Sequence, residues 1–249
     1  MISYLPMGRM GNCLFQAACT IALALRNGTN FSMPFKTSNE FWSPIYCKHL
    51  QNTAWQEGRI DVVIEEKQFH YVPIEYSKSW NDKQVLLKGY FQDERYFLDF
   101  KDEVIRCFNF PWELKSDVCS IHARYGDYLT IAGKHILLDD DYLRAAIKEI
   151  TARTGIVRFK VFSDDINTFK ARHGNLYQFE YSTNTNEVDD MIEISCCHSH
   201  INSSSTFSWW GAYLNKNPDK VIITQRDWFQ PGWDGADTSK IIPSTWIKL

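Results

Sequence analysis

The sequence has no long apolar run, no excess of one charge and no regular spacing of cysteines. No stretch approaches the ~20 consecutive apolar residues of a membrane-spanning helix, and the first residues lack the basic start and apolar run of a signal peptide. The net charge of −3 offers no basic surface to nucleic acid or to an anionic membrane. We therefore expect no membrane span and no nucleic-acid partner, and we expect any basic site to be local.

The cysteines do not suggest a disulfide framework. There are seven of them, an odd number, at positions 13, 19, 47, 107, 119, 196 and 197. Several stand among apolar residues, where a free thiol behaves as a small hydrophobic side chain. A reduced chain in the cytoplasm fits this pattern better than a secreted one.

What the sequence does contain is a regular α/β pattern. Its 249 residues suffice for one large domain or two small ones. From about residue 116, short apolar runs alternate with amphipathic segments, which predicts βαβ units around a parallel sheet. Residues 30–80 have no clean period and are interpreted as short strands and loops. The expected strands are 2–5, 85–90, 118–122, 157–162, 176–179, 200–203 and 221–224. The expected helices are 14–25, one from about 93, 140–153, 165–173, 187–197 and 208–214.

An arginine follows the first strand of the second half, in the segment Ser120-Ile-His-Ala-Arg-Tyr-Gly-Asp127. Ligands of parallel sheets gather at the carboxyl ends of the strands, and a guanidinium there presents a fork of donors to phosphate oxygens. Asp127 would orient Arg124 or act as a base. The alternative is a surface arginine beside a turn.

Hydroxyl side chains accumulate where a later strand gives way to a helix, in the segment Ser203-Ser-Ser-Thr-Phe-Ser208. Free backbone N–H groups and the helix dipole favour an anion such as a diphosphate at this place. Plain N-capping by Ser205 or Thr206 is the alternative, although three successive hydroxyls exceed what capping requires.

Two further segments border predicted strands. Asp164 and Asp165 end the strand 157–162, where a carboxylate can accept from guanine or from ribose; the alternative for Asp165 is a helix N-cap. The segment Gly8-Arg-Met-Gly-Asn12 is a glycine turn that enters a helix and is not the dinucleotide fingerprint. An N-cap is the alternative role of its asparagine.

Two runs contain the atoms of metal ligands but have simpler interpretations. The three aspartates at 139–141 stand where a helix begins, and acidic side chains suit the helix dipole there. The run Cys196-Cys-His-Ser-His200 lacks a second pair at zinc-finger spacing and fits a helix end that runs into a strand. We therefore expect no metal ion and no other cofactor.

Five collinear segments carry a resemblance that covers nearly the whole chain. They are Gly8-Arg-Met-Gly-Asn-Cys-Leu-Phe-Gln16, Gly89-Tyr-Phe-Gln92, His122-Ala-Arg-Tyr-Gly-Asp-Tyr128, Phe162-Ser-Asp-Asp165 and Ser205-Thr-Phe-Ser-Trp-Trp-Gly-Ala212. In this order they resemble glycosyltransferase family eleven, the α-1,2-fucosyltransferases. Their joint occurrence is far more specific than any single motif.

The resemblance implies an α/β fold of the GT-B type, in which two Rossmann-like domains face each other across a cleft. Residues 1–114 would form the acceptor-side domain and residues 115–249 the domain that binds the GDP-sugar. The implied reaction is an inverting transfer of L-fucose from GDP-β-L-fucose to a glycan acceptor, at the 2-hydroxyl of a galactoside. A compact chain without an anchor suits a bacterial or viral enzyme of the cytoplasm.

The resemblance also implies site residues. In the reaction that it implies, Arg124 would stabilise the charge that grows on the β-phosphate. Asp127 and His135, which stand near Arg124 in the sequence, are the two candidates for the general base. The residues implied to bind or border the donor are His122, Arg124, Asp164, Asp165, Ser205, Thr206, Phe207, Arg9, Gly11 and Asn12.

Two positions depart from the family pattern. Tyr125 replaces a second arginine, which we expect to remove a positive charge beside the diphosphate, and Cys13 replaces a glutamine. Two alternatives therefore stay open: an enzyme of the same fold that uses another GDP-sugar, and a nucleotide- or carbohydrate-binding protein without turnover.

Overall fold

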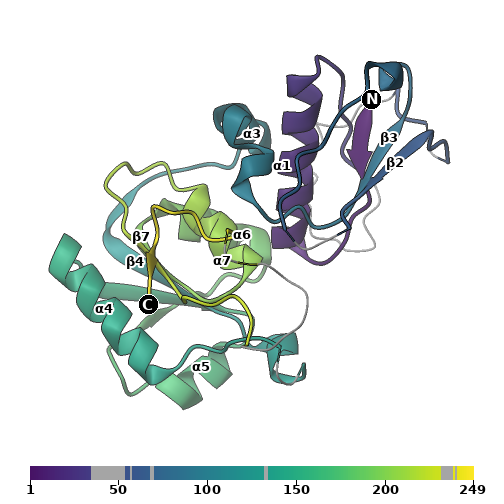
Figure 1. Cartoon of the computed structure of the whole chain (residues 1–249). Coiled ribbons are helices and arrows are strands. Elements are labelled where there is room, and N and C mark those ends of the chain that lie inside the picture. The colour runs from purple at the N-terminus through teal and green to yellow at the C-terminus, as the bar shows by residue number, and fades with distance from the viewer. Residues whose placement is uncertain (35–53, 57, 68–69, 132–133, 231–237, 239) are drawn as a thin grey trace. The chain divides into compact units, whose positions relative to one another are not determined.

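The contacts of the chain divide it into two units (Figure 1). The computed structural model describes residues 1–34, 54–56, 58–67, 70–131, 134–230, 238 and 240–249. The first unit comprises Met1–Phe110 and Gly235–Ile241, and the second comprises Pro111–Asp234 and Ile242–Leu249. Cys47 and part of the stretch 30–80, where short strands and loops are predicted, lie outside the described residues.

The first unit is built on a small parallel sheet. Its strands β1 (Ile2–Tyr4), β3 (Val85–Lys88) and β2 (Val62–Glu65) lie in the order β1-β3-β2. Helix α1 (Met10–Arg26) follows β1 and is buried along nearly its whole length. The apolar face predicted for this helix is therefore only part of the surface that it buries.

Three 3-10 turns and a short helix complete the described part of the first unit: η2 (Lys78–Trp80), η3 (Glu94–Tyr96), η4 (Leu98–Phe100) and α3 (Lys101–Phe108). We expected one helix from about Asp93. Asp93 does cap η3, but Phe97 has a φ of −139°, outside the helical range, and interrupts the helix. The continuous helix begins only at Lys101.

The second unit is a six-stranded parallel sheet. Its strands are β4 (Lys115–Ala123), β5 (Arg158–Ser163), β6 (Glu180–Tyr181), β7 (Cys197–Asn202), β8 (Ile222–Thr224) and β9 (Ile247–Lys248). They lie in the order β6-β5-β4-β7-β8-β9. Numbered within the unit this order is 3-2-1-4-5-6, the order of the Rossmann fold. The topological switch point of the sheet therefore lies between β4 and β7.

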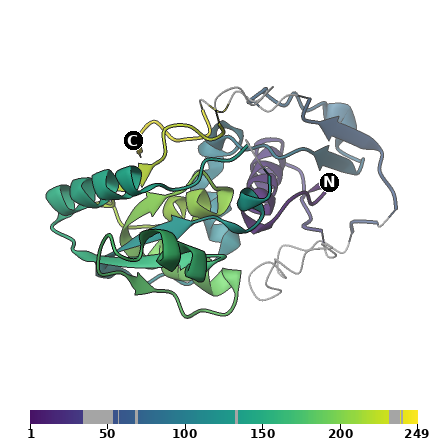
Figure 2. The same ribbon diagram turned by 90° about the horizontal axis from the view of Figure 1, so that it is seen from below.

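Helices cover both faces of this sheet (Figures 1 and 2). Helices α4 (Asp140–Thr154) and α5 (Ile166–His173) lie on one face, and α6 (Glu187–Cys196) and α7 (Thr206–Tyr213) lie on the other. Successive side chains of a strand point to opposite faces. Along β4, Ile121 accordingly packs in the cluster under α4 and α5, whereas Val118 packs with residues of the α6 face.

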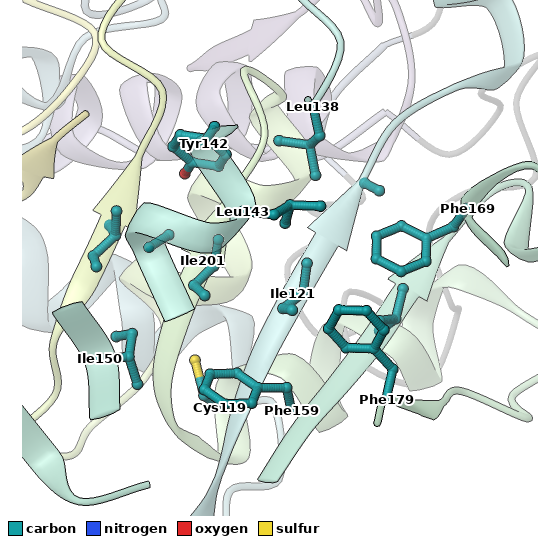
Figure 3. Packing of buried hydrophobic residues seen from close by; sticks show 14 of the residues in the cluster. Cys119, Ile121, Leu138, Tyr142, Leu143, Ile150, Phe159, Phe169, Phe179 and Ile201 are labelled. Atoms are coloured by element: carbon teal, nitrogen blue, oxygen red, sulfur yellow. The ribbon is translucent and has the colours of Figure 1, made fainter. Parts of the chain in front are cut away.

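Figure 3 shows the larger apolar cluster, which lies between the sheet and helices α4 and α5. Strand side chains meet helix side chains there: Cys119, Ile121, Phe159 and Ile201 with Leu143, Ile150 and Phe169. Full burial of one such aliphatic or aromatic side chain stabilises the fold by roughly 1.5–3 kcal/mol. This packing fixes the sheet whose carboxyl edge is described below.

Three differences from the predicted elements concern this unit. The strand predicted at 176–179 is wrong, because only Glu180–Tyr181 pairs with β5, while Phe179 is buried against Phe169 with ring centroids 5.3 Å apart. Strand β9 was not predicted, since two residues carry no readable alternation. Helix α7 begins at Thr206 and not at residue 208, which places the hydroxyl-rich turn directly at its start. None of the described helices has the length and apolar character that crossing a bilayer requires.

Candidate functional site

The candidate site lies at the carboxyl ends of β4 and β7, where the strand order reverses. His122 is paired with Asn202 across the two strands, and the amide of Ser203 donates to the carbonyl oxygen of His122 at 3.1 Å. Ligands of open parallel sheets bind at such a switch point. The fold thus places Arg124 and Ser205 at the same edge of one sheet, as the strand-end argument predicts.

Arg124 is held by two carboxylates. Its Nη1 lies 2.8 Å from Oδ2 of Asp164, and its Nη2 lies 2.5 Å from Oδ1 of Asp127. The arginine side chain is only 12% exposed, so the guanidinium is oriented before any anion arrives. Asp127 is 51% exposed. It orients Arg124 in the way the sequence suggests, and it is the more exposed of the two carboxylates.

Asp164 is part of the framework of the Arg124 turn. Its Oδ1 accepts the backbone N–H of Tyr125 at 2.9 Å, and its Oδ2 pairs with Arg124. A Cβ atom on Gly126 would lie 2.3 Å from Oδ2, so glycine is needed for this close approach. Both carboxylate oxygens have protein partners, and a contact with guanosine would have to share them.

Asp165 has the capping role that was its alternative. It is the N-cap of α5, where Oδ1 accepts the N–H of Thr168 at 2.9 Å and Oδ2 accepts the threonine hydroxyl at 2.6 Å. These hydrogen bonds lower the pKa of the carboxyl group. Its contacts are those of a helix cap.

The turn between β7 and α7 is held by hydrogen bonds to the helix that follows it and to Gln225. Ser205 is the N-cap of α7 and accepts the N–H of Phe207 at 3.3 Å. The N–H and hydroxyl of Ser204 donate to Oε1 of Gln225 at 2.9 and 3.2 Å, which anchors the turn to the end of β8. Thr206 and Phe207 begin the helix, where backbone N–H groups and the helix dipole favour an anion.

His122 supports this turn from within the core. Its Nδ1 lies 2.5 Å from the hydroxyl of Ser208 and 3.2 Å from that of Ser203, and its ring lies 5.0 Å from that of Phe207. Burial, with a smaller contribution from Arg124, lowers its pKa to about 3. The imidazole is therefore neutral, and with 5% exposure it acts on the site through the serines.

Tyr125 does not lie beside the guanidinium of its neighbour. Its side chain is fully buried in the cluster under α4 and α5, where its ring stacks on His173 at 6.4 Å. The tyrosine ring therefore lies in the core and does not line the side of the turn on which Arg124 meets Asp127.

His135 packs face to face with Tyr128. Their ring centroids are 3.6 Å apart and their planes differ by 7°. His135 also forms an isolated antiparallel bridge with Phe229. Burial, followed by the charge of Lys134, lowers the pKa of His135 to about 4. The imidazole is therefore neutral at pH 7, and its Nδ1 is buried without a hydrogen-bond partner among the described residues.

Arg9, Gly11 and Asn12 belong to the first unit, at the start of α1. The N-cap position is held by Arg9, so Asn12 is not the N-cap but a residue of the first helical turn. Its Oδ1 accepts a hydrogen bond from Nε2 of Gln92 at 2.8 Å. This bond joins two of the segments that carry the family resemblance.

The turn that presents Gln92 is strained. Phe91 has a φ of +51°, in the left-handed region that bulky side chains rarely adopt. Glu66 holds it there by accepting the N–H groups of Tyr90 at 2.6 Å and of Phe91 at 3.1 Å. Such strain persists only where the surroundings over-determine it, and it concentrates at functional sites.

The two runs with metal-ligand atoms are used structurally. Asp139 caps α4, and Oδ1 of Asp140 lies 2.6 Å from Nδ1 of His173. Cys196 ends α6 and Cys197 begins β7, as the helix-into-strand interpretation predicts. Among the residues that the structure describes, no group of His, Cys, Asp and Glu is arranged to hold a metal ion.

Sequence reasoning missed three residues that hold the site together: Tyr128, Ser208 and Gln225. Gln225 directly follows β8, so the strand-end rule applied to Arg124 could have found it. Tyr128 ends the segment His122–Tyr128 that carries the family resemblance, but the sequence alone shows no role for it. Ser208 carries no signal, because one serine in a helix does not show which histidine it will meet.

An arginine and a hydroxyl-rich helix start at the switch point of a Rossmann-ordered sheet are the features of a nucleotide-binding α/β protein. The chain belongs to a particular family of such proteins, glycosyl transferase family 11, whose model matches residues 3–247. The family indicated by the five segments is thereby confirmed.

Three relatives show the range of the family. The O-antigen biosynthesis glycosyltransferase WbnK of Escherichia coli is 34% identical over 186 residues, which cover 66% of this chain and 60% of that protein. An alpha-1,2-colitosyltransferase of Escherichia coli is 30% identical over 197 residues, which cover 70% of this chain and 67% of that protein. Galactoside alpha-(1,2)-fucosyltransferase 2 of Oryctolagus cuniculus is 23% identical over 288 residues, and the match covers 98% of this chain and 78% of that protein. The matched part of this chain thus spans less than two thirds of the first of these relatives.

Proposed function

We propose that the protein is an inverting glycosyltransferase that moves L-fucose from GDP-β-L-fucose to the 2-hydroxyl of a galactoside in a glycan acceptor. The observation that carries this proposal is the pre-oriented guanidinium of Arg124 at the same sheet edge as the capped turn at Ser205. Family membership and the names of the relatives support a sugar nucleotide as the ligand.

In this reaction the bond between the anomeric carbon and the β-phosphate oxygen breaks, and the acceptor oxygen bonds to that carbon from the opposite face. Negative charge grows on the departing diphosphate. Arg124 and the helix dipole at the start of α7 stabilise this charge, and the reaction proceeds without a metal ion. The acceptor hydroxyl loses its proton to a general base.

Asp127 is the better of the two candidate bases. Both of its contacts with Arg124 use Oδ1, so its Oδ2 has no protein partner among the described residues. His135 has one ring face covered by Tyr128 and its Nδ1 buried. In this proposal the first unit supplies the acceptor side, with Asn12 and Gln92 as its polar centre, and the two units form a GT-B enzyme.

A different donor sugar is the second candidate, and one observation favours it. Relatives of this chain are named for different sugars: one that is 30% identical is a colitosyltransferase, and one that is 23% identical is a fucosyltransferase. The proposed diphosphate contacts do not depend on the sugar. They support a nucleoside-diphosphate sugar without selecting fucose.

The test is a ligand screen followed by a transfer assay. A ligand that binds only the folded state raises its melting temperature by mass action, so GDP should stabilise the protein and UDP should not. GDP-fucose incubated with lactose should then yield an α-1,2-linked product, identified by NMR of the anomeric proton. Stabilisation by UDP and not by GDP would contradict the proposed donor. Transfer from another GDP-sugar, with none from GDP-fucose, would establish the second candidate.

A further inference from the structure

Tyr128 touches both halves of the proposed diphosphate site. One face of its ring stacks on His135 with centroids 3.6 Å apart, and the guanidinium carbon of Arg124 lies 5.7 Å from the ring centroid. Its hydroxyl donates to the carbonyl oxygen of Ser204 at 3.2 Å. A single side chain therefore spans from the arginine after β4 to the turn after β7.

The hydroxyl of Tyr128 is also hydrogen-bonded to Ser205, the N-cap of α7. Burial raises the pKa of Tyr128 to about 12, and a side-chain hydrogen bond with Ser205 acts against that rise. Ser205 accepts the N–H of Phe207 at the same time. The orientation of the Ser205 hydroxyl is thus fixed from two directions, by the helix that it caps and by the tyrosine.

The ring of Tyr128 is held as firmly as its hydroxyl. His135, which covers one face of the ring, is held by Gln230. The backbone N–H of Gln230 donates to the carbonyl oxygen of Lys134, and its side-chain amide donates to the carbonyl oxygen of His135. A cation over an aromatic face is attracted to it within about 6 Å, which favours the observed place of the Arg124 guanidinium.

We infer that Tyr128 is a positioning residue that sets the spacing between Arg124 and Ser205, so that both meet the same diphosphate. This inference rests on the proposed function. The tyrosine contacts the arginine by its ring and the serines by its hydroxyl, and it need not touch the substrate. Its role is to keep Arg124 and the turn at Ser205 at a fixed spacing while negative charge grows on the leaving diphosphate.

The chain offers a matched control in Tyr142. The hydroxyl of Tyr142 donates to the carbonyl oxygen of Asn202 at 2.8 Å, just before the same turn, but its ring lies in the cluster under α4. Tyr128→Phe and Tyr142→Phe therefore each remove one tyrosine hydrogen bond to a neighbouring backbone carbonyl. Only the first breaks the link to Ser205.

The test compares the wild-type protein, Tyr128→Phe, Tyr142→Phe and Tyr128→Leu, with GDP binding measured by calorimetry and hydrolysis of GDP-fucose measured per folded molecule. Loss of a hydrogen bond network of this kind should lower kcat of Tyr128→Phe by about 5- to 10-fold, with a change in GDP affinity of less than about threefold. Tyr142→Phe should melt at a lower temperature but keep the kcat of the wild type.

Tyr128→Leu also removes the ring, and it should weaken GDP binding in addition to lowering kcat. The positioning role is overturned if Tyr128→Phe matches Tyr142→Phe in kcat while the wild type is active. It is overturned equally if Tyr128→Leu binds GDP as the wild type does. A wild-type protein that neither binds GDP nor hydrolyses GDP-fucose contradicts the proposed function itself, and this role with it.

Discussion

Asp164 holds Arg124 from the neighbouring strand: its Oδ2 lies 2.8 Å from Nη1 of the arginine, and its Oδ1 accepts the backbone N–H of the next residue. One carboxylate thereby fixes both the direction of the guanidinium and the path of the turn. The order of the site before ligand binding depends on this pair more than on the exposed Asp127.

Replacement of Asp164 by asparagine should therefore disturb the site without removing much volume. The amide has one acceptor oxygen where two are needed, so either Arg124 or the backbone N–H loses its partner. Hydrogen bonds to charged groups are worth about 1.5–3 kcal/mol, which predicts a 10- to 100-fold weaker GDP affinity by calorimetry.

Asp165→Asn is the control for this prediction, because the adjacent carboxylate makes the contacts of the α5 cap and none with Arg124. It should lower the melting temperature and leave GDP affinity near that of the wild type. Equal losses of GDP affinity in both variants would show that Asp165 also serves the nucleotide.

Arg124→Lys should fail although it keeps the charge. The guanidinium uses Nη1 for Asp164 and both Nη2 and Nε for Asp127, and an ammonium cannot reproduce that fork. In the proposed function the expected loss in kcat is roughly 10²-fold or more, measured as GDP-fucose turnover. Arg172→Lys, on an arginine that lies over the ring of Tyr125 on the other face of the sheet, is the control and should retain activity. A lysine variant at 124 with nearly normal turnover would remove Arg124 from the mechanism.

The positions of Arg124 and of the hydroxyl turn could be predicted because both depend on local sequence. A strand that ends in a charged residue, or in a run of hydroxyls before a helix, places those groups at the carboxyl edge of a parallel sheet. The alternation of strands and helices after residue 116 gave the elements of the Rossmann order, apart from the two-residue strands β6 and β9. Strands that short have too few residues to show a period.

The partners of these groups could not be predicted, because they come from distant parts of the chain. Nothing in the spacing of Arg124 and Asp164 shows that they form an ion pair, and Asp164 and Asp165 look alike in sequence although their contacts are unrelated. Tyr125 illustrates the same limit: only the folded structure shows that its side chain lies in the core and not beside its neighbour's guanidinium.

His135→Phe should preserve activity. Phenylalanine keeps the stacking on Tyr128 and removes both ring nitrogens, so it tests catalysis apart from packing. Because one face of the His135 ring is covered by Tyr128 and its Nδ1 is buried, we expect kcat within about threefold of the wild type, whereas loss of a true general base costs about 10²- to 10⁴-fold. Asp127→Asn is the comparison and should lose at least tenfold. If the histidine variant lost more than the aspartate variant, the assignment of the base would be reversed.

Two buried histidines should make the protein sensitive to mild acid. Burial lowers the pKa of His122 and of His200 to about 3, and His200 is locked between the hydroxyl of Ser120 and the side-chain amide of Asn215, each at 2.7 Å. In the unfolded chain histidine has a pKa of about 6.5. Below that pH the unfolded state binds more protons than the folded state, so stability is complete above about pH 6.5 and is lost progressively as the pH falls toward 3.

From pH 7 to pH 5 each of these histidines should lower the free energy of unfolding by about 2 kcal/mol. Urea denaturation at the two pH values measures the sum of these contributions and those of the other titrating groups, among them His135, whose pKa burial lowers to about 4. Replacing His200 by glutamine destabilises the protein at both pH values but removes one titrating group, so it should make the difference between them smaller by about 2 kcal/mol. His122→Asn should do the same at the other position. If the difference between pH 7 and pH 5 stayed the same in both variants, these imidazoles would be protonated in the folded protein, and the neutral His122 inferred beneath the Ser203–Thr206 turn would be wrong.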